Sequence, residues 1–294
     1  MKPLTRPVGL VKPKPPAPAQ KPSAPSAKSE ALSRYYGRVQ QDLLARGLLR
    51  QDGGGPDTQF GPHELENNFI RIAFYDEHAR GSLSRADGVA GALHRWVRPV
   101  RMRAEFGPSV SDTIRSRDAA IISNYAARLG RVTGHPVGIT RSDSANFHVL
   151  VASADDTDFV VNRVRQLAPG LSETAMSVFQ SLPRPIHCLV LAFPSEADPN
   201  QHRMAIALVR AEHPDLMRRS CYHEELAQGL GLANDSPAAR PSIFNDDDEF
   251  ALLTTHDEML LKMLYDRRLT PGMSIKQARP IIRQIATELT GQTF

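Results

Sequence analysis

The strongest constraint on the fold is a change from strand-like to helix-like apolar spacing in the second half of the chain. Residues 186–193 (IHCLVLAF) form a continuous apolar run of strand length, and residues 204–210 (MAIALVR) form another after a loop that contains Pro199. Two such runs joined by a loop predict an antiparallel pair. A helix is expected next, from Leu216 to Leu230, and Gly231 ends it.

The remaining segments show the same two kinds of spacing. Helices are predicted over residues 29–49, 118–132, 158–167, 249–265 (with Thr255 as the favoured start) and 275–289. Strands are predicted over residues 69–75, 96–106, 137–139 and 146–152. This order predicts an α/β (α+β) fold, with a mixed sheet and helices packed on it. We expect a single domain over residues 31–294.

Residues 1–30 differ from the rest of the chain in composition. They hold eight of the 23 prolines, with six basic residues against one acid. Such a segment cannot bury enough apolar surface to fold, so we expect a disordered Pro/Ala/Lys-rich tether. The formal net charge of the whole chain is +4 and that of this segment is +5, so residues 31–294 have a net charge of about −1. Without a basic excess in the folded part, we expect no nucleic-acid partner.

The targeting signals are mostly absent from the sequence. No apolar run of signal-peptide type follows Met1, and no apolar stretch is long enough for a transmembrane span. However, a Lys/Pro-rich spacer commonly joins an export signal or a lipid anchor to a periplasmic domain. We therefore expect a periplasmic or envelope-anchored protein if an export signal is missing from this start, and a cytoplasmic protein otherwise.

The densest group of chemically capable residues lies in residues 221–235 (CYHEELAQGLGLAND). On a helix, Glu224 and Gln228 lie one turn apart on the same face. Gly231 permits a left-handed turn that would bring Asn234 back toward them. This frame resembles the metzincin metallopeptidase pattern H-E-x-x-H-x-x-G-x-x-H followed by Asp, in which the three histidines bind zinc.

Three downstream segments extend the resemblance. They are residues 242–244 (SIF), 253–257 (LTTHD) and 264–265 (LY), and Phe244 stands at the methionine of the metzincin Met-turn. The resemblance covers about residues 98–265 and implies a zincin-like mixed sheet. Residues 31–97 would then be an N-terminal helix and strand extension, and residues 266–294 a C-terminal helix.

At a closer level the chain is similar to a proteobacterial family, domain of unknown function 2927, many of whose members have features of exported lipoproteins. The similarity is carried by Arg95-Trp96, residues 131–136 (RVTGHP), Glu224-Glu225, Gln228, Asn234-Asp235, Ser242 and residues 264–266 (LYD). The family brings no assigned activity.

The departure from the metzincin pattern is informative because a catalytic zinc ion needs three good protein ligands and an open place for water. Glu224 can ligate a metal, but Gln228 and Asn234 offer only neutral amide oxygens. Glu225 occupies the general-base position, yet without a metal-bound water it has nothing to activate. The resemblance therefore implies an inactivated site with no metal or other cofactor, in a binding or structural protein of the envelope whose ligand is a protein or a peptide.

Two alternatives stay open for this segment. In the first, the polar side chains only cap the end of the helix and form local hydrogen bonds; these are Glu224, Gln228 and Asn234. In the other, the chain is an atypical metal-dependent hydrolase or peptidase that recruits a histidine to bind a divalent metal. The candidates for that histidine are His187, His223 and His256.

Cys188 and Cys221 are the two cysteines of the chain. They can be two buried free thiols. The zincin resemblance instead places Cys188 in a strand that runs past the helix opened by Cys221, which implies a disulfide and an oxidising compartment. Such a bridge would enclose about 32 residues and contribute about 3–4 kcal/mol to stability.

Overall fold

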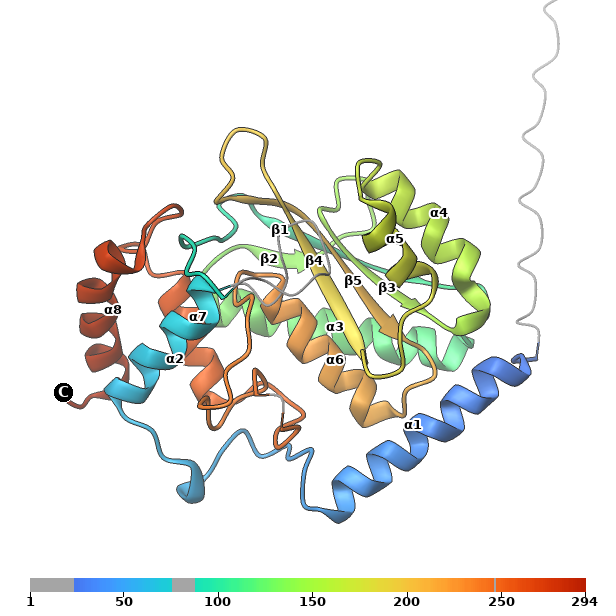
Figure 1. Ribbon diagram of the computed structural model, residues 1–294, viewed down its shortest axis with the longest axis horizontal. Helices are drawn as coiled ribbons and strands as arrows, with labels where there is room; N and C mark the ends of the chain where they lie inside the picture. The colour runs from blue at the N-terminus through green and yellow to red at the C-terminus, as the bar shows by residue number, and fades with distance from the viewer. Residues whose placement is uncertain (1–23, 76–87, 246) are drawn as a thin grey trace, which may run out of the picture.

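One five-stranded sheet forms the centre of the protein (Figure 1). The computed structural model describes residues 24–75, 88–245 and 247–294. The strands follow the order β2-β1-β3-β5-β4 across the sheet, and their bounds are β1 Val100–Phe106, β2 Val137–Ile139, β3 Phe147–Ala152, β4 Cys188–Pro194 and β5 His202–Arg210. Four strands are parallel, and β4 pairs antiparallel with β5 at the edge. The predicted mixed α/β fold and the predicted antiparallel pair are both confirmed.

Helices cover both faces of the sheet. One face packs against α3 (Asp112–Thr133) and α6 (Asp215–Gln228), and the other against α4 (Thr157–Leu167) and α5 (Glu173–Gln180). Successive strand residues point to opposite faces, so the central strands are apolar on both sides. The core under α6 contains Val149, Val151, Ala207 and Val209, and the core under α4 contains Leu150, Ile206 and Leu208.

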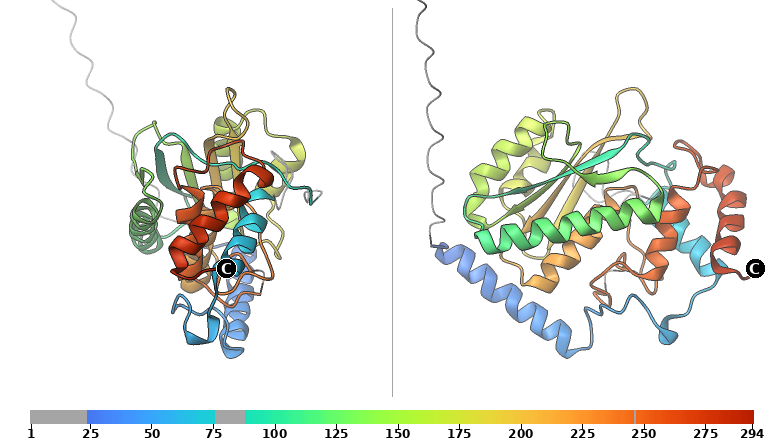
Figure 2. Two further views of the ribbon diagram at one scale, coloured as in Figure 1. Left: turned by 90° about the vertical axis from the view of Figure 1, so that its left-hand side faces the viewer. Right: turned by 180° about the vertical axis from the view of Figure 1, so that it is seen from behind.

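The other helices lie at the end and along the side of this layered unit. The helices α2 (Pro62–Phe74), α7 (Thr255–Leu264) and α8 (Ile275–Thr290) pack together at one end, as the view from behind in Figure 2 shows. Helix α1 (Ala27–Ala45) runs along the side, where Leu32, Tyr36 and Leu43 form a third small core with Met217 of α6. Two short 3-10 turns, Pro56–Thr58 and Ala154–Asp156, complete the described elements.

The strand predicted over residues 69–75 is wrong, because these residues end α2. A short apolar run does not distinguish a strand from one turn of a buried helix. The decisive signals lie upstream, where Pro62 occupies the first turn and the Glu64 side chain accepts a hydrogen bond from Gly61 N at 3.0 Å. Leu65 and Phe69 are buried at helical spacing. The strand part of the predicted extension over residues 31–97 is therefore corrected to a helix.

Other boundaries differ in smaller ways. Residues 1–23 of the predicted tether lie outside the described residues, and α1 already begins at Ala27, with the Ser26 side chain as its N-terminal cap. Helix α5 has no counterpart among the elements expected from the sequence. None of the helices in the described residues has both the length and the apolar character that crossing a bilayer requires.

A buried ion pair joins α3 to α6. The Arg218 guanidinium bonds both oxygens of Asp118, and the side chains are 2% and 1% exposed. The Tyr222 hydroxyl donates a third hydrogen bond to Asp118 at 2.8 Å. Arg218 also donates to the carbonyl of His213, in the connection between β5 and α6. Nearly every polar atom of this pair thus has a partner away from water.

We predict that Asp118→Ala lowers the free energy of unfolding by about 3–5 kcal/mol, because it leaves the Arg218 charge buried without its main partner. Urea denaturation at neutral pH measures the change. Asp215→Ala is the matched control, because Asp215 also pairs with Arg218 at 3.1 Å but its side chain is 63% exposed. That variant should lose about 1 kcal/mol or less. Equal losses in the two variants would contradict the assignment.

Candidate functional site

A cavity of about 300 Å³ lies between the start of β4 and the C-terminal half of α6. Residues 185–190 form one wall, and four carboxylates contribute to its lining: Glu224, Glu225, Asp235 and Asp248. The described lining residues include no Lys or Arg. We call this space the acidic cavity.

The acidic cavity brings together some of the residues of the metzincin frame. Glu224, Glu225 and Gln228 all line it, as their helical spacing requires. Asn234 does not; it is 7% exposed, and its amide donates to the carbonyl of Arg71 in α2 at 3.0 Å. Asp235 lines the cavity instead and accepts a hydrogen bond from Gln228 Nε2 at 3.4 Å. In the sequence frame, Asp235 was only the residue after the third ligand position.

The turn after α6 is fixed by long-range hydrogen bonds. The indole of Trp96 donates to the carbonyl of Gly229 at 2.8 Å, and the Tyr265 hydroxyl donates to the carbonyl of Leu230 at 2.9 Å. Gly231 has φ +127°, and a Cβ there would lie 2.5 Å from the carbonyl oxygen of His94. Glycine is therefore required at this position by both its conformation and the close approach.

The downstream segments of the resemblance form a second fixed turn. Asp257 accepts hydrogen bonds from Ser242 Oγ at 2.5 Å, from Ile243 N at 3.1 Å and from Thr254 N at 2.9 Å. Phe244, at the Met-turn position, is fully buried in the main core. These residues hold the chain between Asp235 and α7 in place. They therefore support the loop beside the acidic cavity.

Comparison with protein families gives one match. Residues 62–284 match the family described as Protein of unknown function (DUF2927). The chain belongs to this family. Comparison with curated proteins and with solved structures finds no match. The matched residues include the sheet and α6, whereas α1 lies outside them.

The three histidines considered as replacement ligands lie in different places in this DUF2927 chain. His187 lines the acidic cavity, and burial lowers the pKa of its imidazole. His223 lines a groove between α3 and α6 instead, where its Nδ1 accepts from Leu253 N at 2.9 Å. Burial lowers the pKa of His223 to about 3, so the ring is neutral. His256 is fully buried beside Asn68.

The donors in the acidic cavity do not fit a catalytic zinc ion. Potential ligand atoms of Cys188, Glu224 and Glu225 lie within 4.8 Å of one another. However, Cys188 is disulfide-bonded and has no thiolate to offer. Of this group, the carboxylates of Glu224 and Glu225 remain as possible ligands, together with the amide oxygen of Gln228. Oxygen donors of this kind suit hard cations better than zinc.

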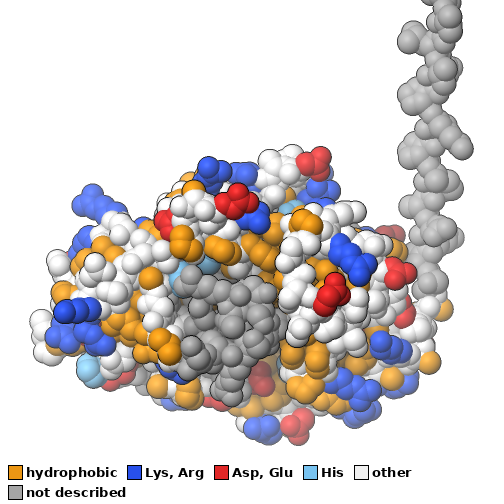
Figure 3. Space-filling view, turned by 45° about the horizontal axis from the view of Figure 1, so that its top comes forward, with side chains coloured by type: hydrophobic (Ala, Val, Ile, Leu, Met, Phe, Trp, Pro, Cys, Tyr) orange, Lys and Arg blue, Asp and Glu red, His pale blue; other side chains and the backbone are white. Residues whose placement is uncertain are grey.

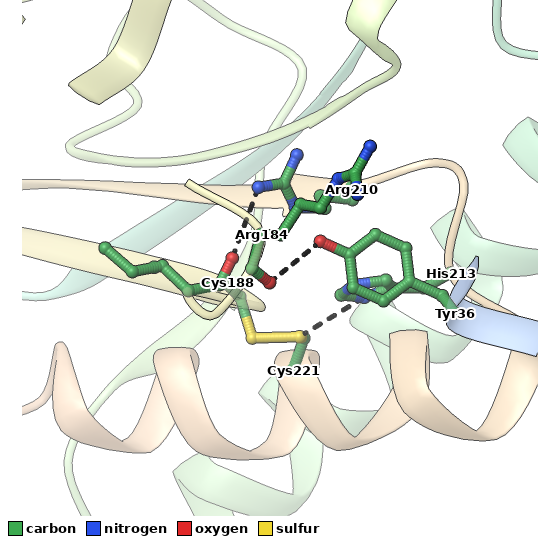
Figure 4. The surroundings of a disulfide bond; sticks show 7 residues. Tyr36, Arg184, Cys188, Arg210, His213 and Cys221 are labelled. Carbon is green, nitrogen blue, oxygen red and sulfur yellow. Dashed lines mark hydrogen bonds between the residues drawn. A yellow bond between two sulfur atoms is a disulfide. The ribbon is translucent and has the colours of Figure 1, made fainter. Parts of the chain in front are cut away.

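The predicted disulfide between Cys188 and Cys221 is confirmed (Figure 4). It joins the start of β4 to α6, so the edge strand and the helix that flank the acidic cavity are covalently linked. Cys221 is 2% exposed, and its sulfur lies 3.7 Å from Nδ1 of His213. The bridge holds the width of the cavity at one end.

We predict that reduction of this disulfide lowers the free energy of unfolding by about 3–4 kcal/mol, because Cys188 and Cys221 lie 33 positions apart and reduction frees the segment between them in the unfolded chain. Urea denaturation with and without a reductant measures the difference. The Cys188→Ala/Cys221→Ala variant is the control, and its stability should not respond to the reductant. Alkylation of two thiols in the native, unreduced protein would contradict the prediction.

Proposed function

We propose that this protein is a binding protein of the bacterial envelope with an inactivated metzincin-like site. Its ligand is an extended segment of a peptide or protein that lies along β4 and places a basic group in the acidic cavity. The observation that carries the proposal is the position of the acidic cavity beside the edge strand of the sheet.

Strand β4 offers a backbone edge to such a ligand. Within the described residues, β5 is its sheet neighbour on one side, and no described strand pairs with the other side. An extended peptide can add to an edge of this kind through main-chain hydrogen bonds, while pockets beside the edge select its side chains. Residues 188–190 belong both to β4 and to the wall of the acidic cavity.

The lining of the acidic cavity is rich in carboxylates. Four carboxylates from α6 and the following loops contribute to it, and the described lining residues carry no Lys or Arg. The face shown in Figure 3 has acidic and basic side chains interspersed. A basic side chain of the ligand would meet these carboxylates in the cavity, whereas an acidic side chain would be repelled by them.

Two features favour binding over hydrolysis. The metzincin ligand positions carry Glu224, Gln228 and Asn234, and the amide of Asn234 is turned to α2. The sulfur of Cys188 lies near Glu224 and Glu225, but it is part of the disulfide and cannot bind a metal ion as a thiolate. The same disulfide supports an oxidising compartment, as expected for a protein of the envelope.

We predict that a short capped peptide of β-branched residues with a central Lys binds more tightly than the same peptide with a central Glu. Fluorescence anisotropy with labelled peptides measures both affinities. Glu224→Gln/Asp235→Asn should weaken the Lys peptide by about tenfold, which corresponds to about 1.4 kcal/mol. Methylation of alternate backbone nitrogens in the peptide should abolish binding, because it removes the donors that pair with the strand edge.

Glu173→Gln is the matched control for charge, because Glu173 is exposed on α5, on the opposite side of the sheet. It should leave the affinity unchanged. Equal affinities for the Lys and Glu peptides would rule out selection by the acidic cavity, and tolerance of backbone methylation would rule out pairing with β4.

The alternative function is an atypical metal-dependent hydrolase, favoured by His187 and the two glutamates in one cavity. We expect metal analysis of the purified, unreduced protein to show less than stoichiometric zinc, because the donor set lacks a thiolate and two imidazoles. We also expect Glu225→Gln to leave casein hydrolysis at the background rate. Chelator-sensitive hydrolysis that this substitution removes would instead establish the hydrolase.

A further inference from the structure

A groove of about 490 Å³ lies between α3 and α6, which are side by side on one face of the sheet (Figure 1). Ile121, Tyr125 and Arg128 of α3 line it at helical spacing. Arg219 and His223 of α6 line it one turn apart. We call this space the basic groove. None of the described residues lines both it and the acidic cavity.

The basic groove carries an excess of positive charge. Its described lining includes four arginines and one acidic residue, Asp215. Two of the arginines are already partnered, one by Asp215 and the other by Glu258. The remaining two, Arg131 and Arg219, form no ion pair within the described residues. The groove therefore keeps guanidinium groups whose charge is not balanced by a neighbouring carboxylate.

His223 brings a hydrogen-bond donor to the basic groove. The residue is 7% exposed, and its ring stacks on the ring of Tyr125 with the centroids 4.0 Å apart. Its Nδ1 accepts from Leu253 N, which places the proton of the neutral ring on Nε2. Nε2 has no acceptor among the described residues, and it is not one of the fully enclosed atoms that lack a partner there. It therefore keeps accessible surface, in a residue that lines the groove.

Two arginines lie near this imidazole. Burial lowers the pKa of His223 most, and the charges of Arg128 and Arg219 lower it further. One of these arginines belongs to α3 and the other to α6, so the guanidinium groups approach the ring from both helices. A neutral N–H donor beside two guanidinium groups favours an anion that has several acceptor oxygens.

The size of the basic groove and the apolar part of its lining define the ligand further. The volume lies within the range of about 300–1,000 Å³ typical of small-molecule pockets, so the groove has room for an organic group beside the anion. Ile121 offers this group a partly exposed apolar side chain. A phosphate monoester has three acceptor oxygens and a charge of about −1.5 to −2 at neutral pH. It therefore suits three donors better than a carboxylate, which has two oxygens.

We propose that the basic groove binds a small organic phosphate monoester. Its phosphate oxygens accept from Nε2 of His223 and from the guanidinium groups of Arg128 and Arg219. Its organic part packs against Ile121. Arg131, one turn from Arg128, adds positive charge where the groove meets solvent. This binding is separate from peptide binding at the acidic cavity, because the two spaces are lined by different rows of α6 residues.

Phosphorus NMR titration of the full-length, unreduced protein with phenyl phosphate tests the proposal, at about pH 8, where the monoester is doubly charged. Two further probes are methyl phenyl phosphate, which has a single charge, and inorganic phosphate, which lacks the organic part. We expect saturable binding of phenyl phosphate and at least about tenfold weaker binding of each of the other two. No saturable binding of phenyl phosphate would overturn the proposal. Equal binding of methyl phenyl phosphate would overturn the monoester assignment, and equal binding of inorganic phosphate would overturn the contact with Ile121.

Arg219→Gln tests the guanidinium contact, and we expect it to weaken the binding of phenyl phosphate by about tenfold. The matched control is Arg165→Gln, because Arg165 is an exposed arginine of α4, which covers the opposite face of the sheet. The affinity of this control should change by less than about twofold. Equal losses in the two variants would show that only the net charge matters and would overturn the site.

His223→Asn tests the imidazole contact, because the side-chain oxygen of Asn can still accept from Leu253 N while the donor at Nε2 is lost. We expect about tenfold weaker binding of phenyl phosphate, with a native circular dichroism spectrum. An unchanged affinity would overturn the contact with His223. If this variant does not fold, Arg219→Gln still decides the proposal, because Arg219 is partly exposed.

Phosphate monoesters also occur on a lipid, phosphatidic acid. Co-sedimentation with phosphatidylcholine vesicles that contain phosphatidic acid distinguishes this source from a small molecule. We expect Arg219→Gln to leave the fraction of protein retained on these vesicles unchanged, because the donor of His223 lies in a residue that is only 7% exposed. A loss of retention in this variant would assign the phosphate group to a lipid surface and would overturn the assignment to a small molecule.

Discussion

The ion pair between Asp118 and Arg218 sets the position of α6, which forms one side of the acidic cavity. Its two charges are almost completely removed from water, so they hold α3 and α6 in one relative position rather than a range of positions. Toward its C-terminus, α6 presents Glu224 and Glu225 to the acidic cavity. Near the start of the helix, Arg218 bonds the carbonyl of His213, so the same ion pair also fixes the connection between β5 and α6.

Most of the fold follows from local apolar spacing. The edge pair β4–β5, the helix α6 and the helices α7 and α8 all lie where the periodicity predicts them. The strand prediction for residues 69–75 is wrong for a physical reason. The apolar residues at the end of α2 fit a strand and a helix equally well, and only the helix start at Pro62 distinguishes the two. Helix α5 is short, and its few buried residues give too little periodicity to predict.

The candidate site was predictable only where local geometry decides it. Glu224, Glu225 and Gln228 share the acidic cavity because helical spacing places them together. Asn234 lies beyond a turn whose direction depends on Gly231 and on distant partners such as Trp96 and Tyr265. Its own partner is a carbonyl of α2, a segment that the sequence patterns had read as a strand. The contact could therefore not have been anticipated from residues 221–235 alone.

The inward position of Arg210 and Glu212 has only a weak signal in the sequence. Arg210 ends a strongly apolar strand, and Glu212 follows two residues later, so two opposite charges stand where a buried element meets a loop. Periodicity alone does not say whether such charges turn to solvent or inward. In the structure they turn inward, because the ends of α1, α4 and α5 meet around them.

The backbone before β4 is held by the last residue of β5. Arg210 donates to the carbonyls of Leu182 and Pro183 and also, at 3.3 Å, to the carbonyl of Ile186, which lines the acidic cavity. Two residues later the disulfide at Cys188 fixes the same segment to α6. Arg210 at the end of β5 therefore holds one end of the backbone wall of the acidic cavity, and the disulfide fixes the other end to α6. Because both attachments are long-range, the shape of this wall depends on the packing of β5 and α6 rather than on the local sequence of residues 182–188.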